Sequence, residues 1–388
     1  MPKRSPNKKK SHSKTIFFSI LAVLICIVLG SWFLFHQTTP RSFSVDEQEK
    51  INETVTSFMD KYKIPGVIVA IWIPEKGNFI KGYGLANTDT KQTMDPFMSF
   101  RIGSITKTFI ATILLQLQDE GKINLDDTLD MYITNPAVPN ANKITLRQLS
   151  NMTSGLYNYS NDTNFEKNHA ENLQKPWTSE ELVNIAISHP SNFMPGTEYE
   201  YSNTNFILLG MVIEKVTGNT IEKEVKNRII SPLKLSNTYY PTTSYMPLNS
   251  AHGYSLVDLD TKEVIDTTYD NPSWGAAAGA IVSDIHDLRV WAEAMGKGKL
   301  ISPVAQKQRF TWDTQPGAAY GIGTMKIGKN FVGHEGHIDG YNTVFFYLPS
   351  KNATIIVMQN LNPSETEGIA GNIGAMIAKI VLPHDVNW

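Results

Sequence analysis

The strongest constraint on the fold of this chain is the placement of its β-strand signals, which lie near the two ends of 388 residues. β-Branched and aromatic residues at 66–74 and 78–85 predict a hairpin. Comparable signals return only after a mostly helical block over about 124–300, at 320–327, 331–334, 343–348 and 354–359. The simplest arrangement joins the terminal strands in one antiparallel sheet beside a helical subdomain.

Apolar residues at helical spacing predict the helices that cover this sheet and build the subdomain. The first helix is expected over 46–63 and the last over 368–381, and a third, over 106–120, carries an apolar stripe. Further helices are expected at 179–189, 205–216, 221–230 and 284–295. The expected fold class is α/β of the α+β kind, an antiparallel sheet flanked by N- and C-terminal helices plus an all-helical subdomain.

An uncharged apolar segment, 15–35, precedes these elements and is long enough to cross a bilayer core of about 30 Å as a helix. All charged residues in 1–14 are basic, which predicts a cytoplasmic tail and an exported domain. We expect an uncleaved single-pass membrane anchor, a linker over 36–45 and an extracellular domain over 46–388. A cleaved signal peptide, which would release the domain, is the alternative, although the apolar run ends without a small-residue cleavage site.

Cysteine content and charge exclude several classes of function. Cys26, the only cysteine, lies inside the apolar segment, so the exported part has no disulfide and no thiol nucleophile. The formal net charge of −2 becomes −8 without the six basic residues of the tail. Such a surface argues against nucleic acid as a partner, and against anionic lipid beyond the anchor itself.

Ser104 and Lys107 form an S-x-x-K pair at the start of the helix over 106–120. Residues three apart share a helix face, so the amine can meet the hydroxyl. A desolvated lysine can take the serine proton, and amides at a helix N-terminus can stabilise an oxyanion. The pattern is weak because it also occurs at Ser5–Lys8 and Ser11–Lys14, and an N-cap serine beside a solvated lysine is the alternative.

A second candidate element is Tyr201-Ser202-Asn203. A phenol could relay the serine proton to a leaving amine, and Asn203 could bind a substrate amide. The same Y-x-N spacing occurs at Tyr159 and Tyr269, and a polar loop is the alternative for each.

The third element is His334-Glu335-Gly336, followed by His337, at the end of a predicted strand. Gly336 would let a substrate backbone approach the strand edge, and the next N–H could complete an oxyanion hole. The two histidines also suggest a metal, but a zinc helix needs them four residues apart, so we expect no metal. A surface turn is the remaining alternative.

The three elements in this order resemble the signature of the penicillin-recognising serine hydrolases, within the branch of class C β-lactamases, DD-carboxypeptidases and alkaline D-peptidases. The chain looks most similar to the secreted actinomycete DD-carboxypeptidase and the bacillary alkaline D-peptidases, over about 60–360. The stretches that carry the resemblance are 100–108 (FRIGSITKT), 114–125, 154–162 (SGLYNYSND), 201–218, 274–283 (WGAAAGAIVS) and 333–336.

The resemblance implies a β-lactamase/transpeptidase-like fold and a set of catalytic roles. Ser104 would be the acylated nucleophile, Lys107 its base and Tyr201 the proton shuttle. His334 would replace the lysine usual in the third element. Tyr159 would be a chance match.

The resemblance also implies a substrate groove and an oxyanion hole without metal or organic cofactor. Asn203, Trp274 and Gly336 would line the groove. The backbone N–H of His337 would hold the oxyanion together with that of Ser104.

Two departures from the DD-carboxypeptidase pattern bear on the substrate. That relative places an arginine on the strand before H-x-G, where this chain offers only Lys326. It also has threonine where this chain has Glu335, and an acid there would repel a substrate carboxylate. Both changes favour a D-residue-specific endopeptidase or amidase over a strict carboxypeptidase.

The sequence therefore predicts a membrane-anchored extracellular serine D-peptidase that acts through a Ser104 acyl-enzyme on D-amino-acid peptides, peptidoglycan stem peptides among them. β-Lactams are expected ligands. A class C-like β-lactamase, an esterase and a penicillin-binding sensor remain alternatives, because they share all three elements and differ in whether water hydrolyses the acyl-enzyme.

Overall fold

The computed structural model describes residues 1–2, 26, 42–256, 263–312, 319–362 and 368–386. The chain divides into a segment, Met1–Ser42, and a compact unit, Phe43–Trp388. The unit begins earlier than the expected residue 46, because the Phe43 side chain is buried and Ser44 caps the first helix. Apart from Cys26, the expected anchor lies outside the described residues, and none of the helices described could span a membrane.

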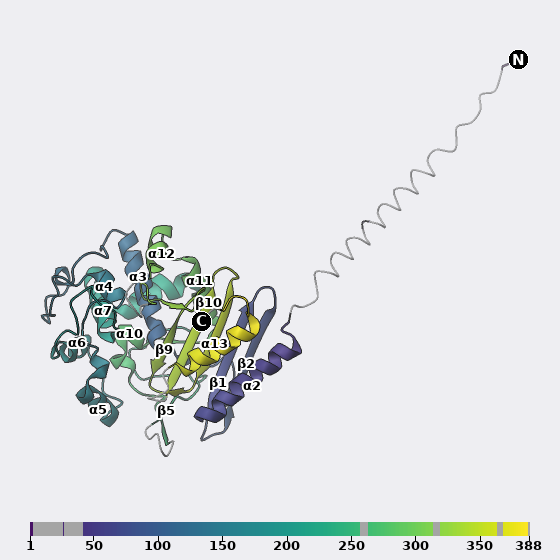
Figure 1. The fold of residues 1–388 in the computed structure, drawn as a ribbon, viewed down its shortest axis with the longest axis horizontal. Helices are drawn as coiled ribbons and strands as arrows, with labels where there is room; N and C mark the ends of the chain where they lie inside the picture. The colour runs from purple at the N-terminus through teal and green to yellow at the C-terminus, as the bar shows by residue number, and fades with distance from the viewer. Residues whose placement is uncertain (3–25, 27–41, 257–262, 313–318, 363–367, 387–388) are drawn as a thin grey trace. The chain divides into compact units, whose positions relative to one another are not determined.

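A seven-stranded antiparallel sheet joins the two ends of the compact unit, as the strand signals predict (Figure 1). Strand β1 (Gly66–Ile73) pairs with β2 (Gly77–Asn87) on one side and with β11 (Ala353–Gln359) on the other. The order is β3-β2-β1-β11-β10-β9-β8, where the remaining strands are β3 (Gln92–Thr93), β8 (Met325–Ile327), β9 (Phe331–Ile338) and β10 (Tyr341–Leu348).

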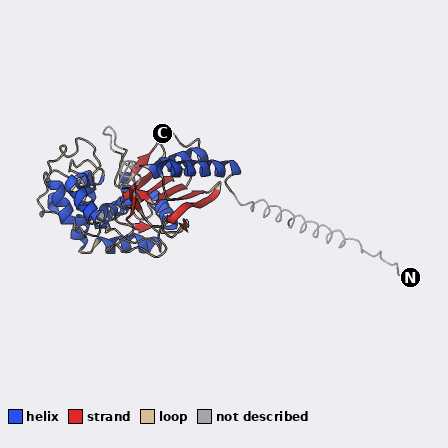
Figure 2. Ribbon diagram, turned by 90° about the horizontal axis from the view of Figure 1, so that it is seen from below, coloured by secondary structure: helices blue, strands red, loops and turns tan. Residues whose placement is uncertain are grey.

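Two layers cover the sheet. Helices α2 (Val45–Tyr62) and α13 (Ile369–Val381) pack together on one face (Figure 2). All residues of β1 are buried, because both faces of the strand are covered. Alternate side chains of β1 enter two cores, with Val69 on the α2 and α13 side and Ala70 on the side of the helical subdomain.

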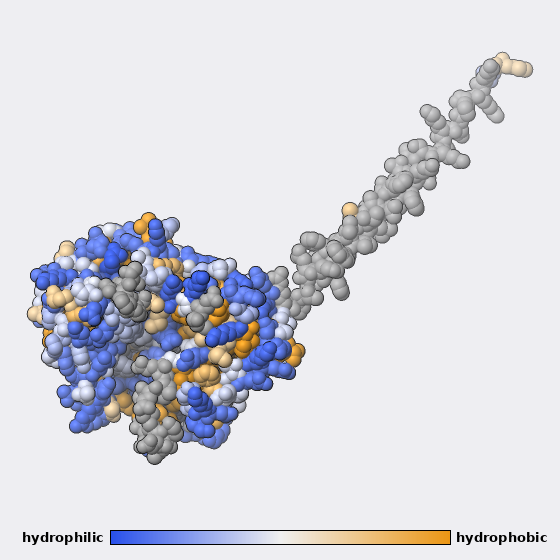
Figure 3. Space-filling view, viewed as in Figure 1, coloured by the Kyte–Doolittle hydropathy of each residue, from blue (hydrophilic) through white to orange (hydrophobic). Residues whose placement is uncertain are grey.

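The helical subdomain lies in the chain between β2 and β8, and two short sheets, β12-β5-β6 and β4-β7, lie outside the main sheet in the described residues. Its helices are α3 (Thr106–Asp119), α4 (Leu146–Ser150), α5 (Thr163–Glu171), α6 (Ser179–Ile187), α7 (Asn203–Thr217), α8 (Ile221–Val225), a π-helical turn (Lys226–Ile230), α9 (Ser231–Leu233), α10 (Ala276–Gly279), α11 (Ile285–Lys297) and α12 (Pro303–Arg309). The short strands are β4 (Phe100–Arg101), β5 (Tyr254–Leu256), β6 (Val264–Asp266), β7 (Val282–Ser283) and β12 (Leu361–Asn362). The face in Figure 3 is mostly hydrophilic, and most large apolar residues of the described chain lie in the two cores.

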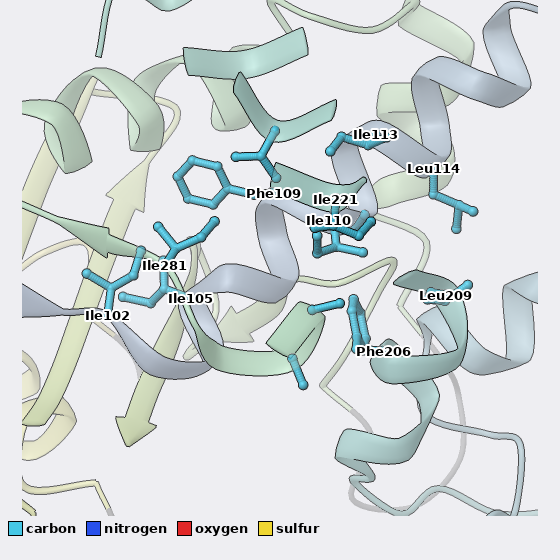
Figure 4. Close-up of a cluster of buried hydrophobic side chains, with 14 of the residues drawn as sticks. Ile102, Ile105, Phe109, Ile110, Ile113, Leu114, Phe206, Leu209, Ile221 and Ile281 are labelled. Atoms are coloured by element: carbon cyan, nitrogen blue, oxygen red, sulfur yellow. The ribbon is translucent and has the colours of Figure 1, made fainter. Parts of the chain in front are cut away.

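Helix α3 lies at the centre of the larger core and departs from the amphipathic stripe expected of it. Nearly all of its residues are buried, Lys107 included, because α7, α8, α10 and α12 pack against it and Trp291 of α11 stacks on Phe109. Phe109 points toward Ile105 and Ile281, and Ile110 toward Phe206 of α7 (Figure 4). The stripe therefore underestimates the burial of this helix.

Two further expectations fail at element boundaries. The strand expected over 320–327 is confined to β8, and Tyr320 makes only an isolated bridge to Met325. The helix expected over 221–230 is α8 followed by a π-helical turn. Both segments contain the apolar residues of the expected element, but tertiary packing decides their backbone geometry.

We expect Trp291→Ala to lower the free energy of unfolding by about 3–5 kcal/mol, since the indole leaves a cavity. The Trp291 ring is fully buried, stacks on Phe109 of α3 at a centroid distance of 4.0 Å, and donates from Nε1 to Thr108 Oγ1 at 2.8 Å. Val304→Ala is the control, because Val304 is exposed and should change stability by less than about 0.5 kcal/mol. Urea denaturation of both variants measures the difference, and equal losses would contradict the assignment of α3 to the core.

Candidate active site

Ser104 lies in a tight turn between β4 and α3 that presses against strand β9. Gly103 has a φ of 50°, and a Cβ there would lie 2.5 Å from the backbone N of His337. A Cβ on Gly336 would lie 1.9 Å from the carbonyl oxygen of Ile102 and 3.2 Å from the backbone N of Ser104. Only glycines at 103 and 336 permit this approach of the two backbones.

The edge of β9 that faces this turn has no strand paired to it in the described chain. Pairing with β8 ends at Gly333, and β9 continues to Ile338 beside the turn that carries Ser104. The backbone N–H groups of Ser104 and His337 thus lie on opposite sides of the same narrow gap. This is the arrangement expected of an oxyanion hole.

Lys107 is fully buried and its amine sits among three oxygen atoms. Its Nζ is 2.7 Å from Ser104 Oγ, 2.8 Å from Asn203 Oδ1 and 2.8 Å from the carbonyl oxygen of Ala278. Desolvation by burial holds the pKa of Lys107 well below its ordinary value. The neutral amine has two N–H donors and one lone pair. Because the two amide oxygens only accept, the lone pair is left for the hydroxyl proton of Ser104.

Tyr201 and Asn203 reach the same amine from the start of α7. The Tyr201 ring centroid lies 4.9 Å from Lys107 Nζ. Asn203 accepts from Lys107 through Oδ1 and donates from Nδ2 to Ser160 Oγ at 3.0 Å. The backbone N–H of Asn203, unpaired within the helix at its first turn, donates to Asn158 Oδ1 at 3.0 Å. Asn203 therefore positions the lysine as well as facing the site.

The segment around Tyr159, which the sequence treats as a chance Y-x-N match, lies beside the site. Tyr159 is fully buried and donates from its hydroxyl to the carbonyl oxygen of Trp274, while Ser160 meets Asn203. Burial raises the pKa of Tyr159, so its phenol stays neutral. Through Tyr159 and Ser160 the segment supports both Trp274 and Asn203. Its place within 154–162, one of the stretches carrying the resemblance, was the signal that could have found it.

His334, the first residue of the third element, lies beside Tyr201. It is fully buried, and burial lowers its pKa to about 3. Its Nε2 is 2.8 Å from the hydroxyl oxygen of Tyr320, and its Nδ1 contacts the carbonyl oxygen of Glu335. Burial therefore favours a neutral imidazole at the position where the third element usually has a lysine.

The side chains of Glu335 and His337 point to the opposite face of the sheet. Glu335 reaches α13, where a Cβ on Gly371 would lie 1.9 Å from its Oε1. The His337 imidazole contacts Asn342, whose Oδ1 accepts from the Ala370 N–H at 2.8 Å. The expected repulsion of a substrate carboxylate by Glu335 is therefore wrong, since alternation along β9 turns this acid away from Ser104. The same alternation separates His334 from His337 and removes the metal alternative for the pair.

Trp274 is held at the end of β9 by polar contacts. Its Nε1 donates to Asp339 Oδ2 at 2.9 Å, and the same oxygen is 2.7 Å from His169 Nε2. Its backbone oxygen accepts from Tyr159. These contacts join the end of β9, α5 and the turn before α10 around Trp274, and its place in the substrate groove stays a prediction.

A serine hydroxyl next to a buried amine, a phenol beside that amine and two convergent N–H groups form the arrangement that a serine hydrolase of the Ser-Lys kind requires. The family model described as Beta-lactamase matches residues 51–378. The chain therefore belongs to the beta-lactamase family.

Individual relatives cover most of the chain. The D-stereospecific amidohydrolase from Streptomyces sp. is 32% identical, with a TM-score of 0.76, over 85% of this chain and 98% of that one. The D-amino acid amidase from Ochrobactrum anthropi SV3, solved with D-phenylalanine, is 25% identical, with a TM-score of 0.73 and the same coverage. The putative penicillin-binding protein PbpX of Bacillus subtilis (strain 168) is 24% identical over 401 residues, 95% of each chain.

We expect Gly336→Ala to lower the rate of Ser104 acylation by about 100-fold, the usual loss when an oxyanion donor is displaced. The new Cβ would collide with the carbonyl oxygen of Ile102 and push β9 from the serine. The control is Gly121→Asn, because nothing lies within 4 Å of a Cβ there and asparagine tolerates a positive φ. Acylation by a fluorescent penicillin gives both rates, and equal rates would contradict the oxyanion hole.

We expect acylation to slow as the pH falls, and Lys107→Met to slow it by about 1,000-fold or more near pH 7. The neutral amine is the base, and its lowered pKa keeps it neutral to lower pH than an exposed lysine. Protonation below that pKa removes the lone pair, so the rate rises with pH through it. Lys299→Met, at a lysine side chain 48% exposed, should keep the wild-type rate and profile. A rate in Lys107→Met that matches the control would contradict the assignment.

Proposed function

We propose that this protein is a serine D-amidohydrolase, which cleaves D-amino-acid amides and D-residue peptides through an acyl-enzyme on Ser104. The observation that carries the proposal is the neutral, buried His334, which offers no positive charge to a substrate carboxylate. An amide or an internal peptide bond presents no such carboxylate at the leaving side. The printed names of the Streptomyces and Ochrobactrum relatives, which are a D-stereospecific amidohydrolase and a D-amino acid amidase, support the same substrate class.

Acylation uses the contacts around the amine. Ser104 Oγ forms a bond to the substrate carbonyl carbon while its proton passes to the lone pair of Lys107. The carbonyl oxygen becomes an oxyanion between the N–H groups of Ser104 and His337. The C–N bond then breaks, and the leaving amine takes a proton from Tyr201, which regains one from the Lys107 ammonium.

Deacylation reverses these transfers with water in place of the amine. Water gives a proton to the neutral Lys107 amine as its oxygen bonds to the acyl carbon, and a second oxyanion forms in the same hole. The bond from carbon to Ser104 Oγ breaks, Oγ recovers the proton, and the free D-amino acid or peptide acid leaves. A β-lactam would follow the first stage and stop wherever water cannot reach the ester.

We also propose that the catalytic unit works on the outer side of a membrane, where peptidoglycan stem peptides would be available. The support is the uncharged run over 15–35 behind a wholly basic tail. Protease treatment of intact cells tests this: an anchored outer domain is digested while the tail stays protected. Full protection of the domain would contradict it.

We expect the enzyme to hydrolyse an N-acyl-D-Ala-D-Ala carboxamide at least as well as the matching free acid. The two substrates differ only in the terminal charge, and a neutral His334 gives no preference for the acid. The comparison is kcat/KM for each, with D-phenylalanine amide and L-phenylalanine amide as a test of stereochemistry. A preference of about 10-fold or more for the acid, worth about 1.4 kcal/mol, would contradict the amidohydrolase in favour of a carboxypeptidase.

The control for this assay is Ser104→Ala, which should abolish every hydrolysis above. Incubation with a fluorescent penicillin separates the remaining functions of the family. Stable label without amide cleavage indicates a penicillin-binding sensor, and rapid loss of label indicates a β-lactamase.

A further inference from the structure

Tyr320 is a buried phenol beside the site that none of the three sequence elements contains. It is 1% exposed, although it lies outside regular strand structure. Its hydroxyl oxygen is 2.8 Å from Nε2 of His334. Burial holds the pKa of Tyr320 well above its ordinary value, so the phenol keeps its proton.

The proton positions in this pair follow from the partners of the imidazole. The carbonyl oxygen of Glu335 can only accept, so Nδ1 of His334, which contacts it, must carry a hydrogen. A neutral imidazole has a single N–H, and Nε2 is therefore an acceptor. Tyr320 must then donate its O–H to Nε2. The other tautomer would set a bare Nδ1 against the carbonyl oxygen.

The same two rings flank Tyr201. The ring centroids of Tyr320 and Tyr201 are 6.0 Å apart at 81°, and those of His334 and Tyr201 are 6.5 Å apart at 53°. Tyr320 and His334 also meet edge to face at 5.5 Å. Lys107 Nζ lies 4.9 Å from the Tyr201 ring centroid. Two neighbours that a single hydrogen bond joins thus contact the Tyr201 ring beside the amine.

We propose that Tyr320 is a positioning residue, whose hydroxyl donates to Nε2 of the Nδ1–H tautomer of His334 and thereby holds Tyr201 against Lys107 for proton transfer. The inference concerns acylation of Ser104 and does not depend on which substrate the enzyme takes. Tyr320 touches neither Ser104 nor Lys107 in the hydrogen bonds of the site. It acts through His334 and Tyr201.

The test is Tyr320→Phe, which keeps the ring contacts and removes only the hydroxyl. The matched control is Tyr347→Phe in β10, which loses a hydrogen bond of similar length, 2.9 Å to Asn352 Oδ1, on the same sheet. In the full-length protein we expect Tyr320→Phe to reduce kcat for D-phenylalanine amide and the acylation rate by a fluorescent penicillin about 10- to 100-fold. KM should change little, because the lost contact acts on proton transfer. The control should keep both rates.

Selective ¹⁵N labelling of histidine gives a second readout that does not depend on activity. The wild-type protein should show His334 neutral, with a proton on Nδ1 and a hydrogen-bonded bare Nε2. In Tyr320→Phe the Nε2 signal should move as it loses its donor, whereas Tyr347→Phe should leave it in place. A wild-type proton on Nε2, or Tyr320→Phe rates equal to those of the control, would overturn the proposal. Penicillin acylation with no amide cleavage would contradict the proposed function but not the role of Tyr320.

Discussion

The chemistry of this protein depends on the removal of one lysine amine from water. An exposed Lys107 would be protonated and could not accept the Ser104 proton, so the burial of α3 on all sides is a functional requirement. The cost of burying the amine is offset because two carbonyl oxygens, those of Asn203 and Ala278, accept its hydrogens. The three-residue spacing of S-x-x-K gives the serine a base only when the lysine is buried in this way.

A second constraint is the contact between two backbones that side chains would keep apart. Gly103 and Gly336 face each other across the gap between the nucleophile turn and β9, and a Cβ on either would collide with the other segment. The oxyanion N–H groups converge because of this absence of side chains. Residues more than 200 positions apart thus form one site, and the sheet that joins the chain termini makes their meeting possible.

Patterns local in sequence predicted more of this site than properties that depend on distant neighbours. The sheet and its covering helices could be read from periodicity, and the resemblance singled out Ser104, Lys107 and Tyr201 from chance matches to the same patterns. The charge of His334 could not be predicted from the sequence, because it depends on burial by Tyr320 and the subdomain. The direction of Glu335 could not either, because it depends on where α13 packs. The anchor over 15–35 stays a prediction, since that segment lies outside the described residues.

The neutral His334 changes how the pKa of Lys107 must be controlled. A cation in the third element would repel the proton on Lys107 and lower its pKa by charge. A neutral imidazole supplies no such repulsion, so desolvation alone must keep the amine unprotonated. Access of water to the amine would then inactivate the base. The hydrogen bonds that close the site around it, from Asn203 to Ser160 and from Tyr159 to Trp274, are therefore part of the proton chemistry as well as of the groove.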